Sequence, residues 1–285
     1  MNKNNSFNKE YESWTEFLDE LKKPTNIRGQ SNDPEHGSWY KTKSFSEAKD
    51  LLINGWPEGT KSILKLKEKL DLNAFVEKSF AIKYDLIGDY PDPGVYNSGN
   101  PECMIDFTYK NNKKGIINIY INSVASSTFS DEDFLRRGAS TLCLIDHLEN
   151  QGYRCGLYTG ESLTSYGNTT YEIIAPLKEP NQQIDLSRLA FVTSHPSFLR
   201  RIIFYINELS PENIRSTFGF NEYGSYGRPS AFLNISKLPI DLSIPELHSN
   251  RQNPFVSDEN SEEWIRQQVA SFESKITQQA DYDEV

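Results

Sequence analysis

The stretch INIYINSVASSTFSDED, residues 117–133, runs from an apolar strand through a turn of small residues into the first turn of a helix. Ser130 and Asp133 have the spacing of a capping box, which predicts that this helix begins directly after Ser130. A second apolar strand follows the helix. Because a strand, a helix and a second strand in this order form a crossover unit, we expect residues 116–122 and 153–158 to pair in parallel.

The rest of the chain fits around this crossover unit as an α/β protein. We expect a mixed sheet of about five strands flanked by helices, with a helical N-terminal extension and a C-terminal helix. Residues 103–109 and 115–122 are expected to form a hairpin, and residues 231–235 a last strand. We expect a disordered segment at residues 1–12, a helical N-terminal region at 13–86 and an α/β core at 87–240. Residues 241–285 are expected to form a loop, the C-terminal helix and an acidic tail.

The composition argues against several classes of protein. The 285 residues carry a formal net charge of −10, whereas sequence-blind coating of nucleic acid depends on Lys and Arg neutralising phosphates. No run of about 18 apolar residues is present, so we expect no transmembrane helix. The first residues lack the apolar core of a signal peptide, and the three cysteines lack paired spacing. These features predict a cytoplasmic protein with free thiols.

The turn after the first strand lacks the residues that common strand-to-helix sites need. A phosphate-binding loop uses glycines and a final lysine, and residues 122–133 contain neither. A nucleophile elbow places glycines beside a serine at the corner, where this chain has Val124 and Ala125. His195, directly before Pro196, is expected to form a hydrogen bond at a helix junction and not to act as a base. The sequence therefore predicts no catalytic residue here.

The layout of residues 117–155 resembles that of von Willebrand factor A-like domains. In those domains an apolar strand ends in Asp-x-Ser-x-Ser, whose oxygens hold a divalent cation at the carboxyl edge of the sheet. Here Asn122 stands at the position of the Asp, Val124 at the first Ser and Ser126 at the second. A hard cation prefers several charged or carbonyl oxygens, and this turn has lost its carboxylate. The resemblance implies a Rossmann-like core with a degenerate metal-type turn, Asn122 and Ser126, without metal or cofactor.

Five blocks of sequence are specific when taken together: NGWPEG (54–59), GNPECMIDF (99–107), RRGASTLCLIDHLENQGYRC (136–155), RLAFVTSHPSFLRRIIFYINE (188–208) and YGSYG (223–227). They resemble blocks of an uncharacterised family of bacteriophage and prophage proteins. The resemblance implies a phage origin and a location in the cytoplasm of an infected host cell. It implies no particular activity, and it carries no catalytic residue over to this chain.

Arginines and aromatic residues are interleaved in the second half of the chain. Arginine beside stackable rings on a flexible loop is the combination that binds single-stranded nucleic acid. The alternative, which we favour for the helical residues, is that the arginines pair with the plentiful acids while the neighbouring phenylalanines belong to the core. Two tyrosines of the glycine-rich loop 219–229 fit a binding role more readily, since no core is evident there. The candidates are Arg136, Arg137, Arg200, Arg201, Tyr223, Tyr226 and Arg228.

Three functions follow, in order of preference. The first is a non-enzymatic phage protein that binds another macromolecule, with a protein partner favoured, through the von Willebrand factor A-like core. The second is a single-stranded DNA-binding factor in phage replication or transcription. The third is an enzyme whose site residues cannot be paired by spacing, which predicts a deep pocket holding a carboxylate or histidine with a shifted pKa. No membrane partner is expected.

Overall fold

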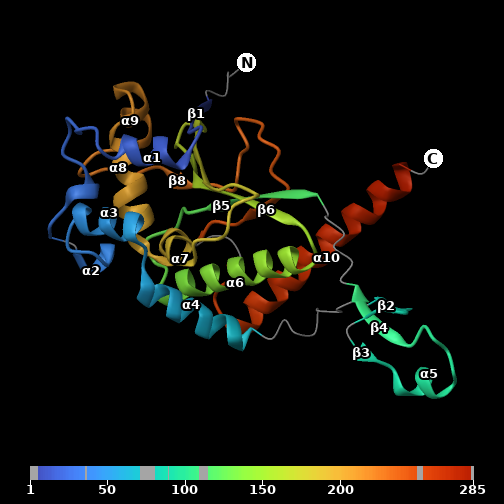
Figure 1. Cartoon of the computed structure of the whole chain (residues 1–285). Helices are drawn as coiled ribbons and strands as arrows, with labels where there is room; N and C mark the ends of the chain where they lie inside the picture. The colour runs from blue at the N-terminus through green and yellow to red at the C-terminus, as the bar shows by residue number, and fades with distance from the viewer. Residues whose placement is uncertain are drawn as a thin grey trace.

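A computed structural model of the chain describes residues 6–35, 37–70, 81–88, 90–108, 115–248 and 253–283. The chain forms a main body, in which helices pack on a mixed sheet, and a small three-stranded sheet beside it (Figure 1). This confirms the α/β class, the central mixed sheet flanked by helices and the C-terminal helix. Within the described residues, no helix combines the length and the apolar character needed to cross a bilayer.

The main sheet has six strands: β1 (Ser6–Glu10), β5 (Ile116–Asn122), β6 (Arg154–Thr164), β7 (Thr170–Lys178), β8 (Arg228–Pro229) and β9 (Leu242–Ile244). Five of them follow the order β1-β7-β6-β5-β9, and β8 pairs with β6. Strand β5 is parallel to both β6 and β9, and β1 is parallel to β7, whereas β7 and β8 run antiparallel to β6. The predicted parallel pair is confirmed, with Ile117 opposite Cys155.

Helix α6 (Asp131–Asn150) connects β5 to β6 across one face of this sheet (Figure 1). The predicted capping box is confirmed: Ser130 Oγ accepts a hydrogen bond from Asp133 N–H at 3.3 Å, and Asp133 Oδ2 accepts one from Ser130 N–H at 2.9 Å. Three acids in the first turn match the positive end of the helix dipole. Apolar side chains of α6 are buried in one core with Ile117, Ile119 and Ile121 of β5.

The remaining helices of the main body surround α6 and the sheet: α1 (Trp14–Glu20), η1 (Gln30–Asn32), α2 (Gly37–Tyr40), α3 (Phe45–Asn54), α4 (Pro57–Lys69), α7 (Leu186–Ser194), the π-helical segment η3 (Phe198–Ile203), α8 (Phe204–Glu208), α9 (Glu212–Phe218) and α10 (Asp258–Asp283). Helix α6 packs against α4, α7 and α10, and α3 packs against α7 and η3. The N-terminal helices are therefore part of the main body.

The opposite face of the sheet is covered by the segment 230–236. The ring of Tyr120 on β5 stacks on Phe232 with ring centroids 4.1 Å apart. The carboxylate of Glu172 on β7 accepts the backbone N–H groups of Leu233, Asn234 and Ile235 at 3.0, 3.1 and 2.8 Å. Residues 231–235, expected as a strand, instead cover the sheet without pairing into it, because this carboxylate takes up their backbone donors.

The small sheet contains β2 (Ala81–Asp85), β3 (Tyr90–Pro91) and β4 (Met104–Thr108), with helix α5 (Pro93–Asn97) between the last two strands. Strand β4 pairs antiparallel with both β2 and β3. The expected hairpin between residues 103–109 and 115–122 is therefore wrong. Strand β5 is already flanked by β6 and β9 in the main sheet, which leaves no edge for β4.

The structure also moves the expected boundaries. Residues 6–10, expected within the disordered segment 1–12, form strand β1, because pairing with β7 satisfies their backbone groups; residues 1–5 lie outside the described residues. Strand β9 lies beyond the expected end of the core at residue 240 and still joins the main sheet. Strands β2, β3 and β4 form the separate small sheet across the expected boundary at residue 86. The three cysteines are free and buried, as expected.

Candidate functional site

The adjacent arginines of η3, Arg200 and Arg201, are buried and donate hydrogen bonds to the segment 31–42. Arg201 donates from Nε to Thr42 Oγ1 at 2.9 Å and from Nη1 to the Ser31 carbonyl at 2.7 Å. Arg200 donates to the Trp39 carbonyl at 2.5 Å, and its guanidinium lies 4.3 Å from a Trp39 ring centroid. Burial lowers the pKa of Arg200 to about 10, so it stays charged at neutral pH. This corrects their prediction as binding residues, since both side chains are enclosed.

The arginine pair of α6 also has structural partners. Arg137 is buried and donates to the Thr193 carbonyl at 2.9 and 3.1 Å and to the Asn122 carbonyl at 3.1 Å. Burial lowers the pKa of Arg137 to about 9. Arg136 forms an ion pair with Asp258 at 3.0 Å and so fastens the start of α10 to α6. Arg137 is therefore not accessible to a ligand, and Arg136 is engaged within the fold.

The glycine-rich loop divides the other candidates. Tyr226 is buried, and its hydroxyl donates to Glu208 Oε1 at 2.5 Å, so it belongs to the core and the prediction of a binding role is corrected. Tyr223 in the same loop is 89% exposed. Arg228 is exposed, and its guanidinium lies 3.7 Å from the ring centroid of Tyr166 in the β6–β7 turn. Tyr223 and Arg228 are the candidates with accessible side chains.

The metal-type turn has a positional role. Asn122 is buried and donates from Nδ2 to the Ser230 carbonyl at 2.9 Å, which ties the end of β5 to the segment that covers the sheet. The Ser126 N–H donates to the Leu247 carbonyl at 2.8 Å and continues the contact between the chain after β5 and the chain after β9. Among the described residues, no three His, Cys, Asp or Glu side chains converge as a metal ion would require.

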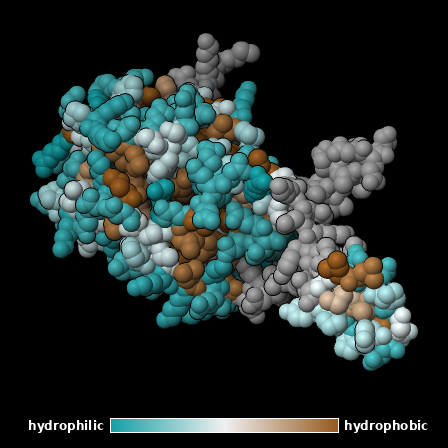
Figure 2. Space-filling view, viewed as in Figure 1, coloured by the Kyte–Doolittle hydropathy of each residue, from teal (hydrophilic) through white to brown (hydrophobic). Residues whose placement is uncertain are grey.

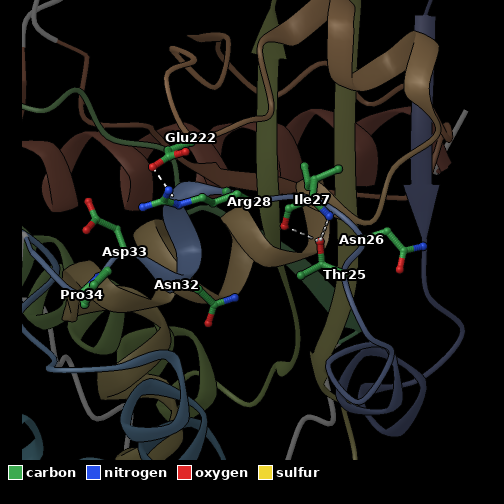
Figure 3. Close-up of a pocket in the computed structure, with 9 residues that line it drawn as sticks. Thr25, Asn26, Ile27, Arg28, Asn32, Asp33, Pro34 and Glu222 are labelled. Carbon is green, nitrogen blue, oxygen red and sulfur yellow. Dashed lines mark hydrogen bonds and ion pairs between the residues drawn. The ribbon is translucent and has the colours of Figure 1, made fainter.

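An open hollow of about 460 Å³ lies between the segments 25–29 and 32–34 and Glu222 (Figure 3). The Arg28 Nε donates to Glu222 Oε1 at 2.9 Å, and the Glu222 N–H donates to the Arg28 carbonyl at 3.1 Å. Figure 3 shows the Arg28 side chain extending towards the end of the hollow where Asp33 and Glu222 are drawn. The hollow therefore has a polar, mixed-charge lining contributed by two distant parts of the sequence.

A buried carboxylate supports one wall of the hollow from beneath. Glu208 accepts hydrogen bonds from the Ser31 N–H at 2.9 Å, the Ser31 hydroxyl at 2.5 Å and the Tyr226 hydroxyl at 2.5 Å. A Cβ at Gly29 would lie 2.1 Å from the Glu208 carboxyl carbon, so only glycine fits there. Arg201 binds the Ser31 carbonyl from the same buried side. Opposite charges therefore hold η1, and with it the hollow, in place.

Two further buried groups have strongly shifted pKa values. Glu161 on β6 accepts a hydrogen bond from Asn207 Nδ2 at 2.5 Å, and burial raises its pKa to about 8. His195 Nδ1 accepts the Ser197 N–H at 3.1 Å, as expected for a helix junction, and burial lowers its pKa to about 4. Neither residue lines the hollow. Within the part of the chain that the structure describes, Glu161 and His195 therefore do not form an acid–base site together with this hollow.

The sequence indicates no site in residues 25–40, and the hollow was therefore missed. The glycines and the proline of this segment indicate turns, but they do not indicate a partner. The opposite wall is Glu222, which the fold brings close from the other end of the chain. No local pattern reports such a contact, so a three-dimensional structure was required to find it.

The chain matches the family described as a domain of unknown function, DUF7192, over residues 1–269. The match includes the small sheet, the hollow and the first part of α10. No curated protein and no solved structure matches the chain. Because the family match spans most of the sequence, the protein belongs to the DUF7192 family, whose function is unknown.

Proposed function

We propose that this is a non-enzymatic protein that binds another protein through the apolar side chains of the small sheet. One observation carries the proposal: large apolar and aromatic side chains are exposed on the small sheet, where Figure 2 shows a group of hydrophobic residues in brown. Ile87 is 84% exposed and Leu86 63% exposed. Exposed apolar clusters mark interaction surfaces more often than isolated apolar side chains do. We call this cluster the small-sheet patch; it consists of Tyr84, Leu86, Ile87, Tyr90 and Tyr96.

The small sheet has little core of its own. Among the described side chains of residues 84–105, Cys103 is the one that is buried. A three-stranded sheet is stable in water when one of its faces is packed against something apolar. A partner that covers the small-sheet patch would supply that packing, so binding and stabilisation of this sheet are expected to occur together.

Charge distinguishes a protein partner from a nucleic acid. Residues 81–108 contain five Asp or Glu and one Lys. A segment with this excess of acids repels a phosphate backbone, whereas it complements a protein surface that carries Lys or Arg around an apolar centre. The expected partner is therefore a protein with an apolar contact area edged by basic side chains.

A non-enzymatic role is supported by the burial of side chains that could act as acids or bases. Glu161, Glu208 and His195 are buried and hydrogen-bonded within the fold. A phage origin, the cytoplasm of an infected host cell and a von Willebrand factor A-like core remain part of the proposal. The sequence blocks support the first two, and the parallel β5–β6 pair joined by α6 supports the third.

The test compares matched surface variants. Leu86→Ser combined with Ile87→Ser removes the centre of the small-sheet patch, and Ile53→Ser removes an exposed apolar side chain from α3 as the control. The wild type and the Ile53→Ser control should capture the same host protein. Benzoylphenylalanine introduced at position 90 should crosslink to that protein. The Leu86→Ser/Ile87→Ser double variant should not capture it. High salt should weaken capture. Equal capture by the double variant, or a change only in self-association, would refute the proposal.

A second candidate function rests on the exposed pair of Arg228 and Tyr166. An arginine stacked on an accessible ring is a feature of single-stranded nucleic acid binding. Fluorescence anisotropy with a labelled single-stranded DNA oligonucleotide, at low and physiological salt, tests it. Binding that falls with salt and is lost in Arg228→Ala and Tyr166→Ala would favour this function. Absence of binding at low salt would remove it.

A further inference from the structure

One wall of the hollow beside Glu222 is held in place by buried charged side chains. Glu208 and Arg201 fasten η1 through Ser31, so this wall is ordered before any ligand arrives. A preorganised wall favours binding, because less conformational freedom is lost when the complex forms. The volume of about 460 Å³ also lies in the range of roughly 300–1,000 Å³ that is typical of small-ligand sites.

The lining contains two carboxylates and one guanidinium, those of Asp33, Glu222 and Arg28. The Arg28 side chain is 79% exposed, and its ion pair with Glu222 is therefore largely screened by water. Such a pair contributes little to stability, so another cation can displace Arg28 from Glu222 at small cost. When Arg28 moves away, the hollow keeps the carboxylate of Glu222 and that of Asp33, whose Oδ1 accepts the Glu35 N–H at 2.7 Å.

We infer that the hollow binds the arginine side chain of a peptide, and that Arg28 occupies the cation position in the free protein. In the complex, the incoming guanidinium pairs with Glu222 and Asp33 while Arg28 turns into solvent. This inference goes beyond the proposed function. The hollow and the small-sheet patch share no residue, so either can fail while the other stands.

The lining chemistry favours a guanidinium over other groups. Guanidinium is planar and presents five donors in a fork that matches a carboxylate, and the amides of Asn26 and Asn32 provide further acceptors in the same hollow. A phosphate or a carboxylate ligand would meet the two acidic side chains and be repelled. A metal ion would need more converging carboxylates than the described residues provide.

The test uses the full chain and isothermal titration calorimetry with the peptide Gly-Ser-Arg-Ser-Gly. The same peptide with citrulline, the neutral isostere of arginine, is the matched ligand control. We expect the arginine peptide to bind with a Kd on the order of 0.1–1 mM at low ionic strength, and the citrulline peptide to bind at least about tenfold more weakly. Equal heats for the two peptides, or no heat for either, would overturn the inference.

Carboxylate variants identify the site. Glu222→Gln and Asp33→Asn should each weaken binding of the arginine peptide by about fivefold, because each removes one charge from the lining. Glu35→Gln is the control, since it removes a carboxylate from the same segment but not from the lining of the hollow. Thermal unfolding of each variant verifies that it folds. Loss of affinity in the Glu35→Gln control equal to that in Glu222→Gln would contradict a specific site.

Arg28→Ala tests the displacement itself. Removing the internal competitor should strengthen binding of the arginine peptide by about two- to fivefold, which is the opposite of the effect expected for a residue that contacts the ligand. Weaker binding in this variant would overturn the inference, as would free arginine amide binding as tightly as the peptide. The Leu86→Ser/Ile87→Ser double variant should keep its peptide affinity, which separates this result from the test of the proposed function.

Discussion

Replacing Glu161 by glutamine should make the free energy of unfolding of the protein less dependent on pH. The Glu161 carboxylate is fully buried on β6 and accepts a hydrogen bond from Asn207 Nδ2 at 2.5 Å. No hydrogen-bond partner of Asn207 Oδ1 is present among the described residues. A protonated Glu161, or a glutamine in its place, can donate to that oxygen and complete a cyclic pair with the amide. An ionised Glu161 can only accept.

The magnitude follows from the pKa difference between the folded and unfolded states. Burial raises the pKa of Glu161 from 4.5 to about 8. Between these values the folded state holds the proton and the unfolded state has released it, so the free energy of unfolding falls as pH rises. The loss is about 1.4 kcal/mol per pH unit, or about 2 to 3 kcal/mol between pH 5 and pH 7. Glu161→Gln carries no titrating group, so this loss disappears.

The assay is thermal unfolding of both proteins from pH 5 to pH 8 in buffers of equal ionic strength. The difference in Tm between variant and wild type should move by about 5 °C in favour of the variant as pH rises from 5 to 7. Comparison at each pH cancels groups shared by both proteins, including His195. Parallel Tm profiles would refute the reasoning, because they would mean that Glu161 has the same pKa in both states.

Two further predictions concern stability. Gly160→Ala should lower the free energy of unfolding by at least about 3 kcal/mol or prevent folding, because its Cβ would lie 1.8 Å from the Ile173 carbonyl oxygen in the neighbouring strand. The control is Gly115→Ala, whose Cβ would have no atom within 4 Å and which should change the free energy of unfolding by less than about 0.5 kcal/mol. Arg137→Met should lower the free energy of unfolding in urea by roughly 2 to 4 kcal/mol, since it removes the guanidinium donors of the Asn122 and Thr193 carbonyls. A loss below about 1 kcal/mol would contradict that assignment.

The parts of the fold that could be predicted from the sequence are those that local chemistry determines. The serine cap at Ser130 is confirmed, because a cap depends on residues three positions apart. The crossover from β5 through α6 to β6 is confirmed for a related reason: its handedness and pairing depend on consecutive elements. The small sheet was missed because alternation identifies a strand without identifying its partner. Strand β4 has the right pattern for a hairpin with β5, yet it pairs with β2.

The candidate site was harder to predict because arginine is ambiguous in a sequence. Arg137, Arg200 and Arg201 were counted as candidates for a charged surface, and all three are buried with backbone carbonyls as acceptors. Burying a charge is costly unless it is hydrogen-bonded, and only the folded chain supplies those acceptors. The sequence shows that Arg200 and Arg201 are adjacent. It does not show the π-helical turn that directs both side chains to the segment 31–42.

These buried charges connect the fold to its proposed binding surfaces. Arg200, Arg201 and Glu208 of the main body fasten the segment 31–42 through hydrogen bonds. Charges used in this way cannot contact a partner, so binding must depend on side chains that the fold leaves outside. These side chains include the small-sheet patch, the Arg228–Tyr166 pair and the Arg28–Glu222 pair at the hollow. The buried charges thus stabilise the main body, and the proposed contacts with a partner depend on side chains that the fold leaves accessible.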